Sequence, residues 1–409
     1  MLRDEADVTE RGVARELEDP SAPLVDAAEL ASQDLEAPGL EPEQEVLTIN
    51  MGPHHPATHG VLRLIVTLQG ERILEVKPVM GYLHTGIEKN CEDKSYWKVI
   101  PFVERMDYLS YFFQMEAFCG CVERLLELEI PRRAEYLRVL HMELNRIHSH
   151  LVWLGTSALD LGAISMFWYC FRERDQILDL FEMSAGQRMH TRYFQVGGVF
   201  EDIPVGFEQK VREFCAVMPS RIDQYEALLD RNEIFLHRTR DVGIVSRERL
   251  LELGVTGPLL RAAGEPWDMR KSPGYLCYGD FDFKIPVGTV GDGYDRYRVR
   301  LQEMRESVRI IEQALDGLPE GPILTEGSIG VKKRLKPPVG TLYYAVESAR
   351  GAYGIILVSE GGTEPYRAKF RTPSYANLGV MYDALPGTMV ADAVAVLGSV
   401  DLVMPEVDR

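Results

Sequence analysis

The sequence predicts an α+β protein in which a central bundle of antiparallel helices is flanked by smaller β-containing parts. Two observations support this class. Between residues 101 and 320, apolar residues recur at helical spacing in long stretches with short connections, which is typical of antiparallel bundles. At both ends, short β-rich runs are bounded by turn residues. We expect an acidic extended arm, a part with a β-hairpin and a His-rich loop, the helix bundle and a C-terminal α+β part, over residues 1–45, 46–100, 101–320 and 321–409.

The N-terminal hairpin is expected from two runs of strand-forming residues. Residues 61–68 read Val-Leu-Arg-Leu-Ile-Val-Thr-Leu, and Gln69-Gly70 provides a turn before a second strand at 72–79.

Five long helices are expected in the bundle. Pro131 marks the start of the second, because proline is tolerated in the first turn of a helix. We expect the glycines that follow Trp153 to break this helix. The last helix is strongly amphipathic, with a charged outer face. The expected helices cover residues 103–129, 131–153, 163–183, 205–232 and 295–315.

The C-terminal part is expected to be mixed. Gly, Pro and aromatic residues become frequent after Gly321. Residues 341–347 and 354–359 have the composition of strands joined through Arg350-Gly351, and a short helix is expected at 390–397.

Acidic charge is concentrated at the N-terminus. The formal net charge is −18, and residues 1–45 hold 14 Asp and Glu against 3 Lys and Arg. The rest is only mildly acidic and has no basic stripe, so we expect no nucleic-acid partner. A segment rich in Ala, Glu and Pro with few aromatic residues is typical of disorder or of an arm that orders on a partner. We expect the arm to lie on a neighbouring subunit.

The six cysteines are scattered and form no C-x-x-C motif. Cys119 and Cys121 point to different faces of the expected helix, so they cannot share a metal. Buried, reduced thiols are the expected state.

Residues 151–171 contain one charged residue, Asp160, and are long enough to test as a membrane span. Gly155 and Gly162 argue against a span. We expect a segment buried against a partner and a peripheral link to the membrane.

A rigid, histidine-rich loop is the strongest local feature. Residues 50–60 read Asn-Met-Gly-Pro-His-His-Pro-Ala-Thr-His-Gly. Proline fixes φ and removes an N–H, so the loop is pre-shaped. Gly60 allows a close backbone approach directly after His59. Imidazoles held in this way suit proton transfer near neutral pH, although a stiff turn with exposed histidines would have the same pattern.

Three further positions carry groups suited to chemistry. Asp160 is a carboxylate in an apolar run, which requires a partner; a backbone hydrogen bond would also satisfy it. Tyr108 follows Arg105 by three positions, so both lie on one face of the expected helix and indicate a polar pocket. A tyrosine packed in the core with its hydroxyl at the surface is the simpler alternative. His190 could equally cap a helix end.

Several sequence blocks, in order, resemble the quinone-site subunit of respiratory complex I, the NADH:quinone oxidoreductase, also called the 49 kDa subunit. The resemblance extends from about Leu47 to the C-terminus. The blocks are Gly-Pro-His-His-Pro-Ala-Thr-His-Gly at 52–60, Tyr-Leu-His-Thr-Gly-Ile-Glu-Lys at 82–89, Val-Glu-Arg-Met-Asp-Tyr at 103–108, Glu-Leu-Asn-Arg-Ile-His-Ser-His-Leu at 143–151, Gly-Gln-Arg-Met-His at 186–190, Glu-Ser-Ala-Arg-Gly at 347–351 and Glu-Val-Asp-Arg at 406–409.

The resemblance implies a role for each candidate residue. His59, oriented by Asp160, and Tyr108 would bind quinone and protonate it. Arg105 and His190 would lie beside a terminal 4Fe-4S cluster that a partner subunit binds, and would tune its potential. The pocket would also be lined by Gly60, Thr156, Asp401 and Val403. Quinone would be the substrate, and no metal or cluster would be bound by this chain.

The resemblance also implies a fold and a setting. The family is distantly similar to the large subunit of nickel–iron hydrogenases, whose metal-binding C-x-x-C pairs are absent here. The expected partners are the terminal-cluster subunit, neighbouring hydrophilic subunits and the membrane subunit that forms the quinone channel. The expected location is peripheral, on the cytoplasmic side of the cell membrane, within a proton-pumping complex. A hydrogenase-like metalloenzyme and a scaffold without chemistry of its own are the alternatives.

Overall fold

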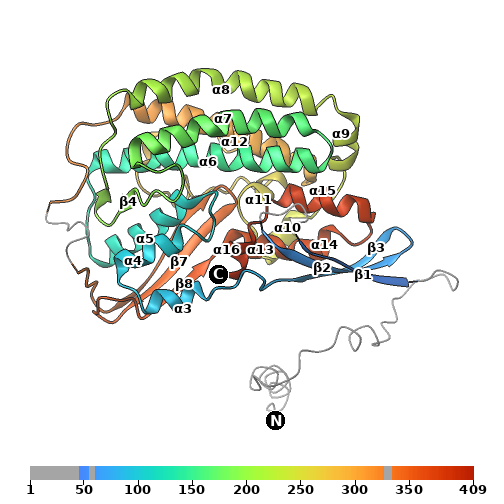
Figure 1. The fold of residues 1–409 in the computed structure, drawn as a ribbon, viewed down its shortest axis with the longest axis horizontal. Coiled ribbons are helices and arrows are strands. Elements are labelled where there is room, and N and C mark those ends of the chain that lie inside the picture. The colour runs from blue at the N-terminus through green and yellow to red at the C-terminus, as the bar shows by residue number, and fades with distance from the viewer. Residues whose placement is uncertain (1–45, 55–59, 327–333) are drawn as a thin grey trace, which may run out of the picture.

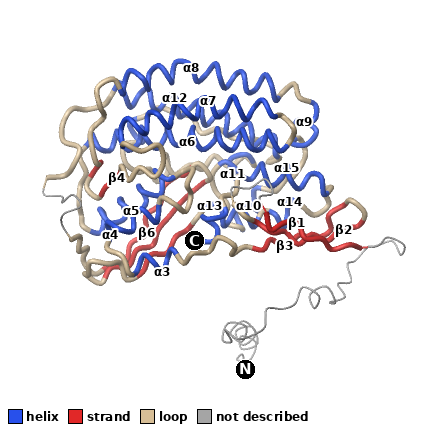
Figure 2. The backbone as a smooth tube through the Cα atoms, viewed as in Figure 1, coloured by secondary structure: helices blue, strands red, loops and turns tan. Residues whose placement is uncertain are grey.

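The structure is a computed structural model that describes residues 46–54, 60–326 and 334–409. The acidic arm and His59 therefore lie outside the described residues. The helix bundle forms one layer, and the two three-stranded sheets lie below it with most of the shorter helices in the view of Figure 1. The α+β class is confirmed, and Figure 2 shows how helices dominate the bundle side while strands gather opposite.

The bundle consists of four long helices that pack against one another: α6 (Arg132–Asp160), α7 (Ile164–Ala185), α8 (Phe207–Leu229) and α12 (Gly293–Asp316). The predictions for α7, α8 and α12 are confirmed to within a few residues. Apolar faces of these helices and of α5 (Tyr111–Leu125) share one continuous core.

Helix α6 is longer than predicted, and the expected break after Trp153 is wrong. Gly155 lies inside the helix, where an added Cβ would lie 3.3 Å from Cys170 Cβ of α7. The glycine thus allows close packing of two helices. The helix ends instead at Asp160, two residues before Gly162, which has a φ of 85°. The Gly162 N–H donates to the Leu159 carbonyl at 2.9 Å and the Ala163 N–H to Ala158 at 2.8 Å, the paired bonds of a Schellman end.

The predicted helix over residues 103–129 is also wrong at its start. The structure has α4 (Tyr96–Val103), a turn over residues 104–110, and then α5. The Asp107 carboxylate accepts hydrogen bonds from the N–H groups of Leu109 and Ser110, both at 3.1 Å. An aspartate that bonds backbone N–H groups just after itself competes with a continuous helix. Arg105 and Tyr108 therefore lie in a turn and not on one helical face.

The N-terminal sheet has three antiparallel strands in the order β1-β2-β3, at Val46–His54, Leu62–Gln69 and Arg72–Val79. The predicted hairpin is β2–β3. Strand β1 was not predicted, and it includes the first half of the stretch treated as a loop. The register of β1 against β2 shifts between Met51 and His54, around Pro53, which lacks the N–H that a regular ladder needs.

The C-terminal part contains a second antiparallel sheet, made of β6 (Gly340–Ser348), β7 (Gly351–Ser359) and β8 (Arg367–Arg371). The first two strands were predicted, and β8 was missed. Helix α5 packs on β6 and β7. The predicted helix at 390–397 is α15 (Val390–Val400), which is followed by α16 (Met404–Asp408).

Shorter elements complete the described chain. They are α3 (Ile87–Glu92), β4 (Phe194–Gln195), β5 (Gly198–Val199), α9 (Glu233–Thr239), α10 (Arg247–Glu252), α11 (Pro258–Ala262), a 3-10 turn (Tyr278–Asp280), α13 (Pro373–Gly379) and α14 (Met381–Ala384). Together with β2, β3, α15 and α16, the C-terminal helices enclose a second apolar core.

Across the described residues, no helix is both long and apolar enough to cross a membrane. All six cysteines are buried and unpaired, as expected.

Candidate functional site

The turn over residues 104–110 meets α6 and the C-terminal segment at Tyr108. Leu109, Val152 and Val403 form a small buried cluster, and Tyr108 and Phe171 pack against it. The Asn145 side chain of α6 holds the turn, donating to the Leu109 carbonyl at 2.9 Å and accepting from the Phe112 N–H at 3.3 Å.

Gly60 is packed against the same C-terminal segment. Its φ is 121°, and an added Cβ would lie 2.8 Å from Met404 Cβ and 2.9 Å from Leu83 Cδ1. A side chain at position 60 would therefore clash. The residue after His59 is thus placed directly beside Met404 and Pro405, which follow Val403 of the Tyr108 cluster. The predicted close approach at Gly60 is confirmed.

Helix α6 presents Val152, Thr156 and Asp160 at successive four-residue steps, which places them on one face. Thr156 is half-buried and its hydroxyl donates to the Val152 carbonyl at 2.9 Å. Asp160 is the exposed last residue of the helix. Since His59 lies outside the described residues, the predicted contact between His59 and Asp160 stays a prediction.

Below Tyr108, a buried arginine joins two carboxylates from distant parts of the chain. Arg350 Nη1 lies 2.8 Å from Asp107 Oδ2, and Nη2 lies 3.1 Å from Asp401 Oδ1. Nη1 also donates to the Ser110 hydroxyl at 3.0 Å. Arg350 is fully buried, and Asp107 and Asp401 are almost so. A guanidinium fork suits such a shared contact, and it locks the turn to the C-terminal segment.

Glu406 adds a third carboxyl group to this region. It is fully buried and makes no ion pair within the described residues. Its Oε1 accepts from the Ser374 N–H at 3.0 Å, whereas Oε2 has no partner there. Burial raises the pKa of Glu406 well above its usual range, and the Asp107 carboxylate adds to this rise. The environment of Glu406 therefore favours the protonated form of its carboxyl group.

The phenol of Tyr108 is half-buried. Burial raises its pKa to about 12, and the Asp107 and Asp401 carboxylates raise it further, against the lowering effect of Arg350. The hydroxyl thus stays protonated over the physiological range and can act as a hydrogen-bond donor.

Arg105 and His190 lie together at the other end of the turn. Arg105 is half exposed, donates to Glu104 Oε1 at 3.1 Å and contacts the Pro101 carbonyl. Helix α7 ends at Ala185 and Gly186 is its C-cap residue, so His190 does not cap that helix. Burial and then the charge of Arg105 lower the pKa of His190. Its ring centroid lies 5.7 Å from that of Tyr111.

Glu104 connects the turn to this second group. It is fully buried, and its Oε2 accepts from the Arg192 N–H at 3.2 Å. Burial raises the pKa of Glu104 to about 7. A carboxyl group near half-protonation thus lies between the backbone that carries Arg105 and the segment that carries His190.

Sequence reasoning missed Glu104, Asp107 and Glu406. The first two are inside the block that contains Arg105 and Tyr108, and Glu406 opens the closing block. Their closeness in sequence to the predicted residues was therefore the signal that could have identified them. Arg350 was expected only to pair with an acid; it pairs with two.

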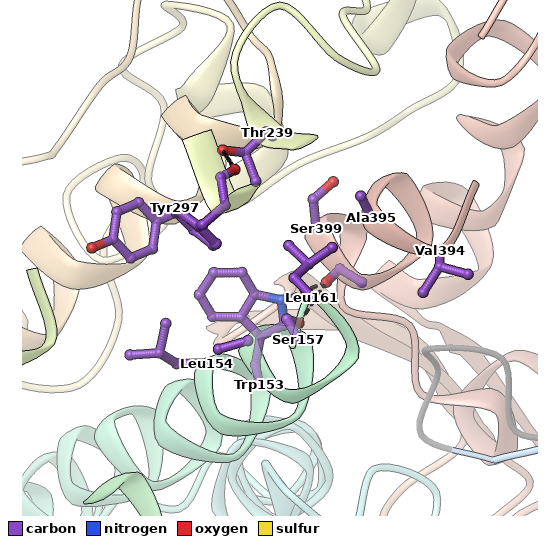
Figure 3. Close-up of a pocket in the computed structure, with 13 residues that line it drawn as sticks. Trp153, Leu154, Ser157, Leu161, Thr239, Tyr297, Val394, Ala395 and Ser399 are labelled. Carbon is purple, nitrogen blue, oxygen red and sulfur yellow. Dashed lines mark hydrogen bonds between the residues drawn. The ribbon is translucent and has the colours of Figure 1, made fainter. Parts of the chain in front are cut away.

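A small internal cavity lies close by but is separate from Tyr108. Figure 3 shows Trp153 and Ser157 of α6 beside Ala395 and Ser399 of α15. The cavity has about 20 Å³, enough for one water molecule. Trp153 Nε1 donates to the Gly398 carbonyl at 2.6 Å, so this contact holds α15 and the start of the Asp401 segment on α6.

No group of three or more His, Cys, Asp or Glu side chains in the described part of the chain is arranged to hold a metal ion.

Comparison with known proteins places this arrangement in a family. The family model described as respiratory-chain NADH dehydrogenase, 49 Kd subunit, matches residues 160–331 and 328–409. The chain is 48% identical over 363 residues to a D subunit of the NADH-quinone oxidoreductase of Solibacter usitatus, covering 89% of this chain and 97% of the relative. It is 47% identical over 364 residues to the corresponding protein of Desulforamulus reducens, covering 89% and 98%. It is 47% identical over 401 residues to that of Chloroflexus aurantiacus, covering 92% and 98%. The chain therefore belongs to the 49 kDa subunit family of complex I, the NADH-quinone oxidoreductase.

Proposed function

We propose that this chain forms the quinone-reduction site of complex I, beside a terminal iron–sulfur cluster that a partner subunit binds. The observation that carries the proposal is the meeting of three segments at one place. Tyr108 packs against the cluster that contains Val403, and Gly60 abuts Met404. These residues come from parts of the sequence separated by tens to hundreds of positions, and the family resemblance implies that Tyr108, Gly60 and Val403 line one pocket.

Tyr108 is the proposed donor to one quinone oxygen. Reduction of a quinone takes two electrons and two protons, and donors aimed at its oxygens stabilise the charge that develops there. A protonated phenol held on the apolar Leu109–Val152–Val403 cluster suits this role. His59, oriented by Asp160, is the proposed donor to the other oxygen.

Arg350 positions the donor. It joins Asp107, the residue before Tyr108, to Asp401, two residues before Val403. Both walls of the proposed pocket are thereby fixed to one rigid group, which lowers the cost of orienting the substrate. Thr156 and Asp401 would line the pocket with Gly60 and Val403.

Arg105 and His190 are proposed to face the partner's cluster. A half-exposed arginine beside a histidine of lowered pKa places positive charge and a titratable ring at the surface, which suits tuning of a nearby reducible centre. The cluster supplies electrons one at a time, and this chain supplies the charge and protons that accompany them.

The proposed setting follows from family membership. The partners are the cluster-bearing subunit, neighbouring hydrophilic subunits and the quinone-channel membrane subunit, with the chain peripheral on the cytoplasmic side. The central bundle flanked by β-containing parts supports the proposed likeness to a hydrogenase large subunit.

The test is Tyr108→Phe in the intact complex, with Tyr136→Phe as the matched control. Tyr136 is a suitable control because its hydroxyl lies at the surface, where it donates to Asp280. We expect Tyr108→Phe to assemble and to keep cluster reduction by NADH, seen by electron paramagnetic resonance, while quinone reduction falls about 100-fold. The control should match wild type.

Near-normal quinone turnover in Tyr108→Phe would instead favour a scaffold that contacts quinone without contributing chemistry. Loss of cluster reduction in the same variant would show that the change acts on assembly or on electron transfer into the cluster and not on quinone.

A further inference from the structure

A large cleft opens on the sheet side of the molecule, away from Tyr108. It has a volume of about 670 Å³ and lies between α4, the Arg192 segment, the start of the β6 region and the β7–β8 connection. Four basic side chains line it: Lys94, Lys98, Arg192 and Arg334. Among the described residues of its lining, Glu364 is the one acid. The cleft therefore carries a net of three positive charges.

The four basic side chains of the cleft are not neutralised by the described part of the chain, and they lie together in one lining. None of the four makes an ion pair with another residue that the structure describes, whereas most other arginines of the bundle do. Acidic residues outnumber basic ones by 63 to 45 in the whole chain. A cluster of like charges repels itself. Placing four cations at one cleft therefore costs electrostatic free energy. An anionic partner would offset this cost.

The local structure directs these cations into the cleft. Arg192 has a left-handed φ of 49°, and its N–H is held by the buried Glu104 carboxylate at 3.2 Å. A left-handed backbone is uncommon for a residue with a side chain. Lys94 lies over the Phe102 ring, 5.9 Å from its centroid. Ser95, which precedes α4, also lines the cleft, so the positive end of that helix dipole adds to the field.

The cleft is continuous with the face proposed to meet the cluster-bearing subunit. Pro101 lines the cleft and its carbonyl contacts Arg105. Arg192 follows His190 by two residues. One partner surface can therefore reach both places, and the chain belongs to a family of complex subunits.

We propose that the Lys94–Lys98–Arg192–Arg334 cleft docks an acidic segment of a neighbouring complex I subunit. The segment should bring at least three carboxylates, to balance the net charge of the lining. Trp97 and Phe102, which line the cleft between the cations, offer aromatic surface for side-chain stems of the same segment. The proposal concerns assembly and does not depend on which residues protonate quinone.

The first experiment is zero-length carbodiimide coupling of the intact complex, followed by peptide mapping. The reagent joins a lysine amine to a carboxylate only when the two are in contact. We expect Lys94 or Lys98 to be joined to an Asp or Glu of another subunit. Coupling to residues 1–45 of this chain, or coupling of neither lysine, would overturn the proposal.

The second experiment measures how charge reversal changes the salt resistance of the complex. We expect Lys94→Glu with Lys98→Glu to raise the fraction of complexes that lose a partner at elevated salt about tenfold. Lys210→Glu with Arg231→Glu, at exposed cations also without ion pairs among the described residues, should match wild type.

The variant Lys94→Arg with Lys98→Arg separates docking from folding, because it keeps the charge. It should assemble as wild type does. Equal salt profiles for wild type and the charge-reversed variant would overturn the proposal. Quinone turnover per intact complex should be unchanged in every variant, so failure here is distinguishable from failure of the quinone site.

Discussion

Two of the buried ionic regions in the described structure have different partners. In the bundle, Glu143 of α6 accepts from Tyr278 and Ser307 at 2.6 Å each, and lies 3.2 Å from Arg146 and 3.3 Å from Arg270. Beneath Tyr108, one arginine serves Asp107 and Asp401, and Glu406 makes no ion pair in the described structure.

The same contrast is visible in the pKa of the central acids. The pKa of Glu143 is lowered despite its burial, because Arg146 and Arg270 face it. The pKa of Glu406 is raised by burial and by Asp107. Both carboxyl groups are fully buried, so burial alone does not decide their state; the number of facing cations does.

This difference separates a network whose acids face several cations from one in which a single arginine is shared. Arg261 continues the bundle network, lying 2.6 Å from Glu303 and 2.8 Å from Glu347. Arg261 and His150 hold the pKa of Glu303 low, whereas burial and the nearby Asp268 raise that of Glu347. The region beneath Tyr108 combines an acid and a phenol of raised pKa with two carboxylates that share Arg350.

The strongest test of the contrast is Glu143→Gln. The substitution leaves Arg146 and Arg270 facing a neutral amide in the core, so we expect a loss of about 3–5 kcal/mol in the free energy of unfolding. Pulse proteolysis in urea would measure it. A loss below about 1 kcal/mol would show that the Glu143 carboxylate does not stabilise the bundle network.

Glu104 predicts a pH dependence of stability. Burial raises its pKa from 4.5 to about 7 in the folded chain. The folded state binds this proton more tightly, so the contribution is full below pH 4.5 and is lost as the pH rises through about 7. The loss amounts to at most about 3 kcal/mol. Glu104→Gln should flatten the unfolding free energy over that range. An identical pH profile in the variant would contradict the shift.

Arg350→Lys should have a smaller effect on stability and a clear effect on activity. A lysine keeps the charge but cannot contact Asp107 and Asp401 as a fork. We expect a loss of about 2 kcal/mol in unfolding free energy and about tenfold slower quinone reduction. Arg305→Lys is the control, since Arg305 bridges Asp223 and Glu226 at the surface. Unchanged quinone turnover in Arg350→Lys would show that Arg350 does not position Tyr108.

Glu406→Gln should have the smallest effect and complements Glu143→Gln. If the carboxyl group is already neutral, an amide of the same shape replaces it with a loss below about 1 kcal/mol. Pulse proteolysis of Glu143→Gln and Glu406→Gln, measured side by side, compares the losses in unfolding free energy of the two regions directly. A large loss at Glu406 would mean that it is ionised and paired, and the two regions would then be alike.

The fold could be predicted where the pattern is local. Apolar spacing predicted α7, α8 and α12, and β-rich runs predicted β2, β3, β6 and β7. Predictions were wrong where tertiary contacts override local preference. Asp107 stops a helix that its neighbours would continue, and Gly155 stays helical because α7 packs against it. The second case shows why glycine, a poor helix former, is still used at a close helix contact.

The sequence by itself indicated the family and the α+β class, because several motifs of the family occur in order along the chain. The resemblance to that family implied the residues proposed for the pocket. Only the tertiary structure decided which of them meet. Asp107 and Arg350 are 243 positions apart, and Arg350 and Asp401 are 51 apart. Pairing across such distances depends on how the bundle and the C-terminal sheet stack. The charge state follows from it, since a buried carboxyl group is ionised or neutral according to the cations that folding places beside it.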